Sequence, residues 1–358
     1  MDAASFRLPA EWQPQAAIAV AWPHENTDWA ARLAEVETSH VALVGAIARF
    51  EPVLVCVASP GVRHRAARLL EAAGVDAARL RFVEIPYDDT WLRDSGPVTL
   101  TDGRRFRVCD FRFTGWGGKF ESGRDDRLVS ELVAHRVFRD AEYSRIDWAL
   151  EGGAIESDGA GTLLTTWRCL HQRHPDASRA TLTRELERHL GAKRVLWLEH
   201  GALEGDDTDA HIDTLARFAP NDSIVFQACD DRSDSHYAEL ALMRDELAAL
   251  QTGDGRRYRL HPLPWPQPIV DQGRRLAASY ANYLVVNGGV LVPAYGDPAD
   301  AQARLVVATA HPGRDVVGIP CRPLIWQNGS LHCLTMQLPA GSLALDHTGS
   351  SPPVATRE

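Results

Sequence analysis

The chain has 358 residues, 45% of them hydrophobic, and a formal net charge of −10 at pH 7. This length allows one large domain or two smaller ones, and the acidic balance argues against a nucleic-acid partner. No stretch approaches the ~18 consecutive apolar residues that a membrane-spanning helix needs, and residues 1–15 lack the basic and apolar regions of a secretory signal. The six cysteines are scattered without a Cys-x-x-Cys pair, which is typical of reduced thiols in the cytosol. We therefore expect a cytoplasmic protein without a membrane or nucleic-acid partner.

Four segments of the chain repeat one predicted order of strand, tight turn, strand and helix, followed by a further strand. The turns are expected at 102–103, 158–159, 220–222 and 287–288, and the helices at 125–138, 178–191, 237–250 and 298–310. The Asn-Gly pair at the last turn is one of the strongest hairpin signals, and Gly191 is expected to end the second helix.

A fifth unit is predicted from the two ends of the chain. Its first strand is residues 331–338 and its second is residues 16–22, followed by a helix at 28–50 and a strand at 52–58. Pairing of the two ends would close the five units into a ring without exposed edge strands. An ordinary α/β sheet with several hairpins fits the same pattern, and the pattern alone leaves both open.

A polar residue stands at or beside the start of each predicted first strand. These residues are Asp94, Glu151, His211, Asn282 and Cys333. If the five units surround an axis, these side chains meet at one end of it, although none are neighbours in sequence. A cysteine, a histidine, carboxylates and an amide in one pocket would form a catalytic group.

The chemistry of such a group favours a cationic substrate. Carboxylates beside a cysteine oppose formation of its thiolate unless a cation lies between them. A guanidinium is such a cation, and its planar donors match carboxylates two at a time. Attack by the thiolate, loss of ammonia and hydrolysis of the covalent intermediate would convert a guanidine to a urea, while a histidine moves the protons.

Six motifs, in order along the chain, resemble the agmatine deiminase branch of the guanidine-modifying enzymes, which also includes the bacterial peptidylarginine deiminases. They are WLRDSGP (91–97), FTGWGGK (113–119), LEGG (150–153), GDDTDAHID (205–213), SYANYLVVNGGVLVPAYGD (279–297) and NGSLHCLTMQLP (328–339). The resemblance covers residues 9–339 and implies an α/β fold, a five-bladed pseudo-symmetric α/β propeller (pentein) of ββαβ units closed by pairing the N- and C-terminal strands. Residues 1–340 then form one catalytic domain and residues 341–358 a flexible tail.

The resemblance also implies roles for single residues. Cys333 matches the nucleophile and His211 the general acid/base. Asp94 and Asp213 match the carboxylates that grip the guanidinium. The matched positions that line the substrate pocket are Glu151, Asn282, Trp91 and Trp116.

Other polar residues near these motifs have plainer interpretations. Asp207 is a candidate to attract a cationic substrate, although it lies with Asp206 and Asp209 in an acidic loop, and such loops are more often simply solvated. His332 is expected to point to the opposite face of its strand from Cys333 and to be structural. Arg93 is expected to face away from Asp94 on an extended segment for the same reason.

The implied reaction is hydrolysis of agmatine to N-carbamoylputrescine and ammonia through a covalent cysteine thiouronium intermediate, in polyamine (putrescine) biosynthesis. No cofactor and no metal are implied, and a homodimer is compatible with the resemblance. Peptidyl-arginine and free arginine are the alternative substrates. Two further classes stay open: a metal-dependent hydrolase that uses His211 and Asp213, for which the sequence shows no compact third ligand, and a catalytically silent binding propeller.

Overall fold

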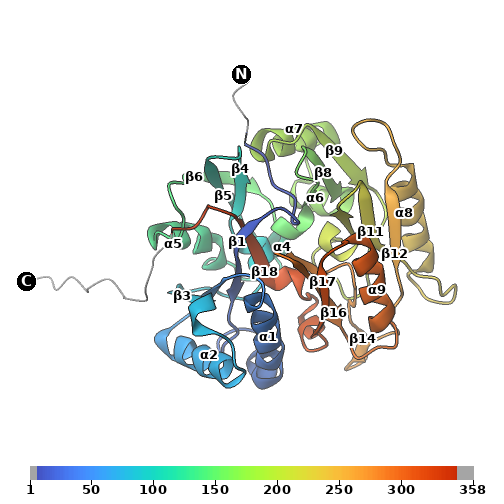
Figure 1. The fold of residues 1–358 in the computed structure, drawn as a ribbon. Coiled ribbons are helices and arrows are strands. Elements are labelled where there is room, and N and C mark those ends of the chain that lie inside the picture. Colours follow the sequence, from blue (N-terminus) through green and yellow to red (C-terminus); the bar gives the residue numbers. More distant parts are fainter. Residues whose placement is uncertain (1–5, 345–358) are drawn as a thin grey trace, which may run out of the picture.

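The computed structural model describes residues 6–344, which fold around five mixed β-sheets and a small two-stranded sheet. In Figure 1 the five sheets and their helices follow one another around the centre in chain order, which brings β1 (Gln15–Ala21) beside β18 (Thr335–Pro339). The chain is therefore an α/β protein with several small mixed sheets, as predicted.

Each of the five sheets starts with an antiparallel pair of strands, and a third strand joins the pair in parallel after a helix. The strands of the four internal sheets are β4 (Val98–Thr101), β5 (Phe106–Arg112) and β6 (Glu142–Ala149); β7 (Glu156–Ser157), β8 (Thr162–Thr166) and β9 (Arg194–Leu198); β10 (Ala216–Ala219), β11 (Ser223–Gln227) and β12 (Arg259–Leu263); and β15 (Leu284–Val286), β16 (Gly289–Ala294) and β17 (Asp315–Pro320). The helices of these units are α3 (Leu92–Ser95), α4 (Gly115–Gly118), α5 (Leu128–Ala134), α6 (Trp167–Arg173), α7 (Arg179–Leu190), α8 (Tyr237–Ala249) and α9 (Asp300–Ala310). The predicted ββαβ order of these units is confirmed.

All four predicted hairpin turns lie between antiparallel strands. The predicted end of the second helix is also confirmed, because α7 stops at Leu190 and Gly191 adopts a left-handed φ of 68°. The Gly191 N–H donates to Glu187 O at 3.1 Å, which satisfies one of the carbonyls left free at the helix end.

The fifth sheet joins the two ends of the described chain, as predicted. Ala19 on β1 pairs with Met336 on β18 in an antiparallel ladder, and β2 (Val53–Val57) lies parallel to β1 after helix α1 (Leu33–Ala48). This sheet then exceeds the predicted unit, because α2 (Pro60–Ala72) and a fourth strand, β3 (Leu80–Glu84), follow β2.

The predicted strand at 331–338 begins four residues late. His332–Leu334 form a 3-10 turn, and β18 starts only at Thr335. A turn forms here because the His332 N–H donates to the side-chain oxygen of Asn282, in another unit, at 2.9 Å rather than to a neighbouring strand. Asp94 likewise lies in the short helix α3, so the polar residues precede their strands in turns instead of starting them.

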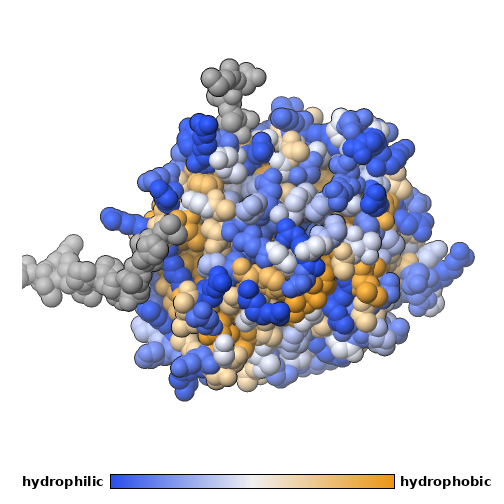
Figure 2. All heavy atoms as spheres, in the orientation of Figure 1, coloured by the Kyte–Doolittle hydropathy of each residue, from blue (hydrophilic) through white to orange (hydrophobic). Residues whose placement is uncertain are grey.

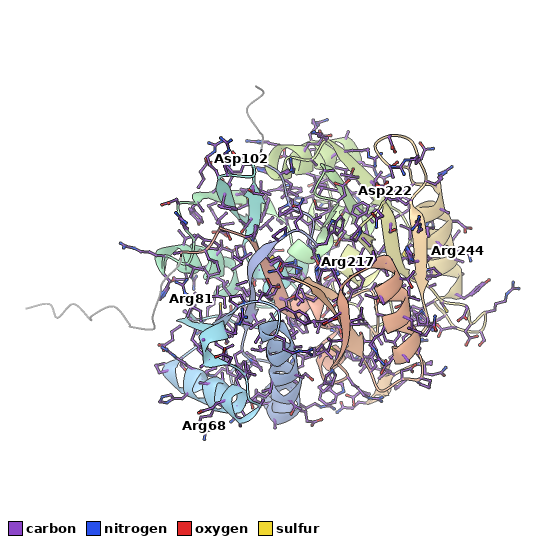
Figure 3. The ribbon with its side chains drawn as sticks, in the orientation of Figure 1. Arg68, Arg81, Asp102, Arg217, Asp222 and Arg244 are labelled. Carbon is purple, nitrogen blue, oxygen red and sulfur yellow. The ribbon has the colours of Figure 1, made fainter. Side chains whose placement is uncertain are left out.

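The core lies between the sheets and their helices, and it also holds charged side chains. All five residues of β2 are buried, because β1 and β3 flank this strand and α1 and α2 contact its unit. Arg217 on β10 is 1% exposed and lies in the middle of the molecule, whereas Asp102 and Arg244 lie nearer its edge (Figure 3). A buried guanidinium needs partners, and Arg217 pairs with Glu11 and Glu156.

On the face shown in Figure 2, hydrophilic residues separate several hydrophobic patches. Among residues 6–344, no helix has both the length and the apolar composition needed to cross a membrane. Part of the predicted tail runs beside residues 137–139, where the Arg139 N–H donates to Ser342 O at 2.8 Å. The rest of that tail, residues 345–358, lies outside the described residues, as do residues 1–5.

Candidate active site

The Cys333 thiol is buried among side chains from other units. Its Sγ is 3.6 Å from Asp213 Oδ2 and 3.2 Å from Asn282 Nδ2. All three residues are almost fully buried. The Asn282 side chain fixes this arrangement, because its oxygen accepts from the backbone N–H of His332 while its nitrogen reaches the thiol.

The His211 imidazole lies on the other side of the same group and is completely buried. Its Nε2 is 3.2 Å from Glu151 Oε2, and its Nδ1 is 3.6 Å from Asp94 Oδ1. Gly153 permits this approach, since a Cβ there would come within 2.6 Å of the imidazole and 2.8 Å of the Asp94 carboxylate. The Gly153 N–H instead donates to Asp94 Oδ1 at 3.0 Å.

Contacts between turns of five different units therefore bring together the polar residues singled out from the sequence. They are Asp94, Glu151, His211, Asp213, Asn282 and Cys333. Only His211 and Asp213 are neighbours in sequence among these six residues, and they flank Ile212 in a single turn.

Negative charge gathers around the thiol. Burial, followed by the charges of Asp213 and Asp94, raises the pKa of Cys333 well above its ordinary value. Burial also raises the pKa of Asp94 to about 6, and the neighbouring carboxylates of Asp213 and Glu151 add to that shift. A cation placed among these groups would lower both pKa values and favour the thiolate.

The imidazole and the remaining carboxylates are held in charged forms. Burial alone lowers the pKa of His211, but Asp94, Cys169 and Glu151, in that order, outweigh it and raise this pKa well above 6.5. Burial alone raises the pKa of Glu151, yet His211 and Arg173 lower it overall. The protonated imidazole is therefore available as a proton donor.

A cavity of about 150 Å³ opens onto the thiol. Cys333 and Asp94 line it, whereas His211, Asp213 and the predicted pocket residues Glu151 and Asn282 are not among its lining residues. Its other lining residues include Asp28, Asp89, Trp91, Trp116, Phe120, Asp207, Trp326 and Asn328. The cavity combines aromatic walls with carboxylates, a composition suited to an elongated cation.

Two predicted tryptophans form part of the wall. Trp116 donates from Nε1 to Asp94 Oδ2 at 2.9 Å, so it orients the carboxylate as well as shaping the cavity. Its φ of 57° is left-handed, which is uncommon for a bulky residue and marks a constrained turn. Trp91 packs so closely on Gly329 that a Cβ there would collide with its ring.

The acidic loop is more ordered than a solvated loop would be. Asp207 Oδ2 accepts from Asn328 Nδ2 at 2.7 Å at the cavity, and burial raises the pKa of Asp207. Asp209 is 2.7 Å from Lys119 Nζ, and Asp206 accepts from the Ala210 N–H at 2.7 Å. The interpretation that the loop is simply solvated is therefore wrong, because each carboxylate has a defined partner.

Sequence reasoning missed Arg173, at the end of α6. Its Nε donates to Glu151 Oε1 at 2.7 Å, and its Nη1 donates to Asp209 Oδ2 at 2.6 Å. The guanidinium thus links the carboxylate behind His211 to the loop at the cavity. Its position directly after Gln172 in a helix gave no sign of this, since a helix-end arginine is usually solvated.

Two arginines near the thiol differ in orientation. Arg93 turns away from the cavity, as predicted, but it does so on the helical turn α3 rather than on an extended segment. Arg274, in the small hairpin of β13 (Val270–Asp271) and β14 (Arg274–Arg275), was not anticipated and lines the cavity. Its guanidinium bonds to Asn328 Oδ1 and Trp326 O.

The basis of the prediction for His332 is wrong, because residues 332–334 form a turn to which the alternation of a strand does not apply. His332 does not line the cavity that Cys333 lines, but its ring contacts two buried carboxylates. His332 Nδ1 is 2.8 Å from Asp213 Oδ2, and Nε2 is 2.6 Å from Glu11 Oε1.

The sequence showed no compact third metal ligand beside His211 and Asp213. The structure has a compact group of another composition, Glu151, Cys169 and His211, whose potential ligand atoms lie within 4.8 Å of one another. The Arg173 guanidinium already contacts Glu151 within this group, and its positive charge opposes a second cation there. Asp213 is not part of the group.

Comparison with known proteins identifies the family of the chain. A family model for Porphyromonas-type peptidyl-arginine deiminase matches residues 7–339. The agmatine deiminase of Pseudomonas putida is 37% identical, with 94% of this chain and 96% of that protein covered. That of Pseudomonas aeruginosa is 35% identical over the same shares of the two chains.

Solved structures give the same result. The agmatine deiminase of C. jejuni with substrate bound superimposes with a TM-score of 0.87 at 32% identity, covering 95% of this chain and 98% of that one. The agmatine deiminase of Enterococcus faecalis has a TM-score of 0.85 at 27% identity, covering 94% and 96%. The chain therefore belongs to the Porphyromonas-type peptidyl-arginine deiminase family, which confirms the resemblance found in its motifs.

Proposed function

We propose that this protein is a hydrolase that converts agmatine to N-carbamoylputrescine and ammonia, a step in putrescine biosynthesis. The observation that carries the proposal is the Cys333 thiol at the end of an acidic, aromatic cavity, with carboxylates on either side of it. The agmatine deiminases to which the chain is similar over nearly its whole length support the choice of substrate.

In the proposed complex the substrate guanidinium lies between Asp94 and Asp213. Its charge replaces the missing cation among the buried carboxylates, so Cys333 ionises when substrate binds. Trp91 and Trp116 lie against the methylene chain, and Asp207 faces the ammonium end of agmatine.

The proposed chemistry has two stages. The Cys333 thiolate forms a bond to the guanidinium carbon, the C–N bond breaks, and protonated His211 gives its proton to the departing amine, which leaves as ammonia. His211 then takes a proton from water as the water oxygen attacks the thiouronium carbon. The C–S bond breaks, the hydroxyl proton passes to solvent as the urea carbonyl forms, and the thiolate is restored; this proton and the ammonia together make ammonium. Side chains and water supply every step.

We also propose that the five sheets are the blades of a pseudo-symmetric α/β propeller of the pentein type, in one catalytic domain spanning residues 1–340. The chain-order arrangement in Figure 1 and the pairing of β1 with β18 support this. The six cysteines are free thiols, which supports a reducing, cytosolic setting.

Substrate choice is tested by ammonia release from agmatine, free arginine and a peptide with C-terminal arginine. We expect kcat/KM for agmatine to exceed that for free arginine by at least ~10²-fold, because a substrate carboxylate would meet Asp207, Asp28 and Asp89 in the cavity. Arg274 is the cationic side chain that lines the same cavity. If arginine or the peptide is turned over as well as agmatine, and Arg274→Gln removes that activity, the substrate is an arginine.

A further inference from the structure

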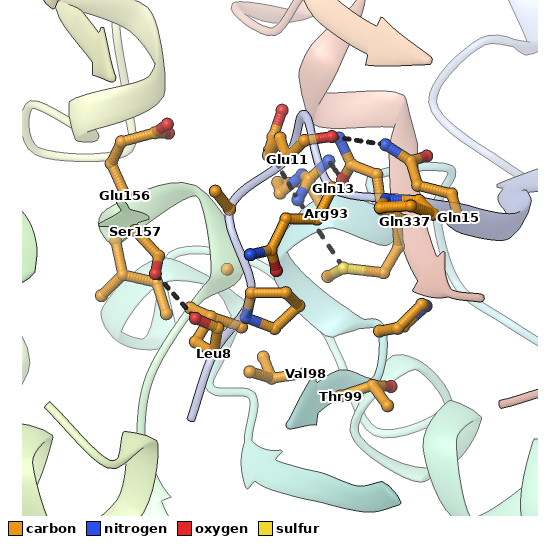
Figure 4. Close-up of a pocket in the computed structure, with 17 residues that line it drawn as sticks. Leu8, Glu11, Gln13, Gln15, Arg93, Val98, Thr99, Glu156, Ser157 and Gln337 are labelled. Carbon is orange, nitrogen blue, oxygen red and sulfur yellow. Dashed lines mark hydrogen bonds and ion pairs between the residues drawn. The ribbon is translucent and has the colours of Figure 1, made fainter. Parts of the chain in front are cut away.

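A second group of ionisable side chains lies behind the thiol, on the side away from the substrate cavity. Its members are Glu11, Arg93, Glu156, Arg217 and His332, all of them buried or nearly so. Figure 4 shows Glu11 and Arg93 facing one another beside a cavity of about 70 Å³. The substrate cavity shares none of these residues.

Glu11 reaches this position from the segment that precedes β1. This segment is tied to other units at two points, where the Arg7 N–H donates to Thr101 O at 3.0 Å and the Leu8 N–H donates to Leu190 O at 3.2 Å. The Ser157 hydroxyl donates to Leu8 O at 2.9 Å. The segment is thus anchored, and its glutamate has a fixed place.

The Glu11 carboxylate is held by cations on two sides. Arg217 Nη2 donates to Glu11 Oε2 at 2.5 Å, and Arg93 Nη1 is 3.4 Å from Glu11 Oε1. Burial alone would raise the pKa of Glu11, but Arg217 and His332 lower it far below its ordinary value. Glu11 is therefore a fixed anion.

The His332 imidazole connects the Glu11 carboxylate to Asp213, which lies beside the Cys333 thiol. It lies between Glu11 Oε1, at 2.6 Å, and Asp213 Oδ2, at 2.8 Å, while the same Asp213 oxygen is 3.6 Å from Cys333 Sγ. The other oxygen of Asp213, Oδ1, is buried and has no hydrogen-bond partner among residues 6–344. His332 therefore holds Asp213 Oδ2, whereas Oδ1 has no hydrogen-bond partner within the described part of the chain.

We propose that His332 and Glu11 are positioning residues that fix the Asp213 carboxylate, so that Asp213 Oδ1 is presented to the substrate guanidinium. Without the imidazole, the carboxylate can rotate about its terminal bond, and the oriented pairing with a planar guanidinium is lost. This inference rests on the proposed function, and it gives the segment before β1 a part in the reaction.

The two nitrogens of His332 allow a matched pair of variants. The amide nitrogen of asparagine falls near the place of Nδ1, which faces Asp213, and that of glutamine near Nε2, which faces Glu11. We expect His332→Asn to keep kcat/KM for agmatine within ~10-fold of wild type and His332→Gln to lose ~10–100-fold, the range found for partners that orient a functional group. Thermal unfolding measures stability separately. A merely structural histidine predicts equal losses, or losses that follow the unfolding temperature, and either result would overturn the proposal.

Glu11→Gln tests the far end of the same chain of contacts. We expect a smaller loss of kcat/KM, up to ~10-fold, and a combined effect with His332→Gln that is less than the product of the two, because the residues act through one carboxylate. Glu51→Gln is the matched control, since Glu51 is 1% exposed and its carboxylate accepts from Asn287, outside both groups of charges. Glu11→Gln activity equal to that of the control contradicts the inference.

These outcomes separate the inference from the function on which it rests. A wild-type protein that releases no ammonia from agmatine contradicts the proposed function itself. An active wild type whose His332 and Glu11 variants match Glu51→Gln contradicts only the positioning role.

Discussion

Two groups of buried charge meet at the centre of this molecule, and they are balanced in different ways. Behind the thiol, the Arg217 guanidinium is held between Glu156, 2.6 Å from its Nε, and Glu11, 2.5 Å from its Nη2. The rear group consists of Glu11, Arg93, Glu156, Arg217 and His332. The front group, at the thiol, contains Asp94 and Asp213 close together. The guanidiniums of Arg217 and Arg93 do not line the substrate cavity.

The difference shows what the front group lacks. Burial raises a carboxyl pKa in both groups, that of Asp94 in front and that of Glu156 behind. The rear group contains its own guanidiniums, whereas in the front group the carboxylates of Asp213 and Asp94 add to the effect of burial on the pKa of Cys333. A substrate guanidinium would occupy the front group much as Arg217 occupies the rear one. In the proposed complex, recognition of the substrate would repeat the pairing of a guanidinium with carboxylates that Arg217 makes.

The largest effect is expected from the thiol in the front group. Cys333→Ser should show no measurable ammonia release while the unfolding temperature stays near that of wild type, because a hydroxyl is far less ionised than a thiol at neutral pH. Cys229→Ser, which changes a cysteine outside both groups, is the control. Turnover of the Cys333 variant within tenfold of wild type would rule out its role as the nucleophile.

A large but smaller effect is expected from the imidazole. His211→Ala should lower kcat by ~10²–10⁴-fold, the usual contribution of a general acid/base. His200→Ala, which removes a partly exposed histidine paired with Glu246, should leave kcat unchanged. A near-normal rate and pH profile in the His211 variant would mean that another group moves the proton.

A smaller loss of activity is expected from Arg173, which links the partner of His211 to the loop at the cavity. Arg173→Gln should lower kcat/KM by ~10–100-fold, because Glu151 would lose the cation that orients it. Arg168→Gln is a matched control on the same helix, since Arg168 is exposed and only distantly paired with Glu239. If both variants behave alike, Arg173 serves stability alone.

The pH dependence of kcat/KM tests the ionisation of Asp94 in the front group. Burial raises the pKa of Asp94 to about 6, so this carboxylate is ionised above that pH and protonated below it. We expect kcat/KM for agmatine to fall as the pH drops through about 6, because a neutral Asp94 no longer attracts the guanidinium. A kcat/KM that stays constant down to pH 5 would contradict this role.

The smallest effect is expected from removal of metals. Exhaustive dialysis against EDTA should leave ammonia release unchanged, since the proposed steps use side chains and water. Loss of activity that zinc restores would transfer the chemistry to the group of Glu151, Cys169 and His211.

The residues that meet around the thiol could be predicted from the sequence, whereas those of the group behind it could not. Cys333, His211 and Asp94 stand in motifs just before hairpin strands, so their convergence follows once five units surround a centre. Glu11 lies in a segment without strand or helix periodicity, and its partner Arg217 comes from a distant unit. The contacts of His332 were missed because the bond from its N–H to Asn282 replaces the first residues of the expected strand with a turn.

The most direct test of the central claim is to trap the intermediate on the enzyme. Agmatine is mixed with excess protein, the reaction is quenched in acid within the first turnover, and the peptides are examined by mass spectrometry. We expect an adduct on Cys333 with the mass of agmatine less ammonia, absent from Cys333→Ser and longer-lived in His211→Ala. Ammonia release without an adduct, or an adduct on another cysteine such as Cys169, would contradict the role of Cys333 as the nucleophile.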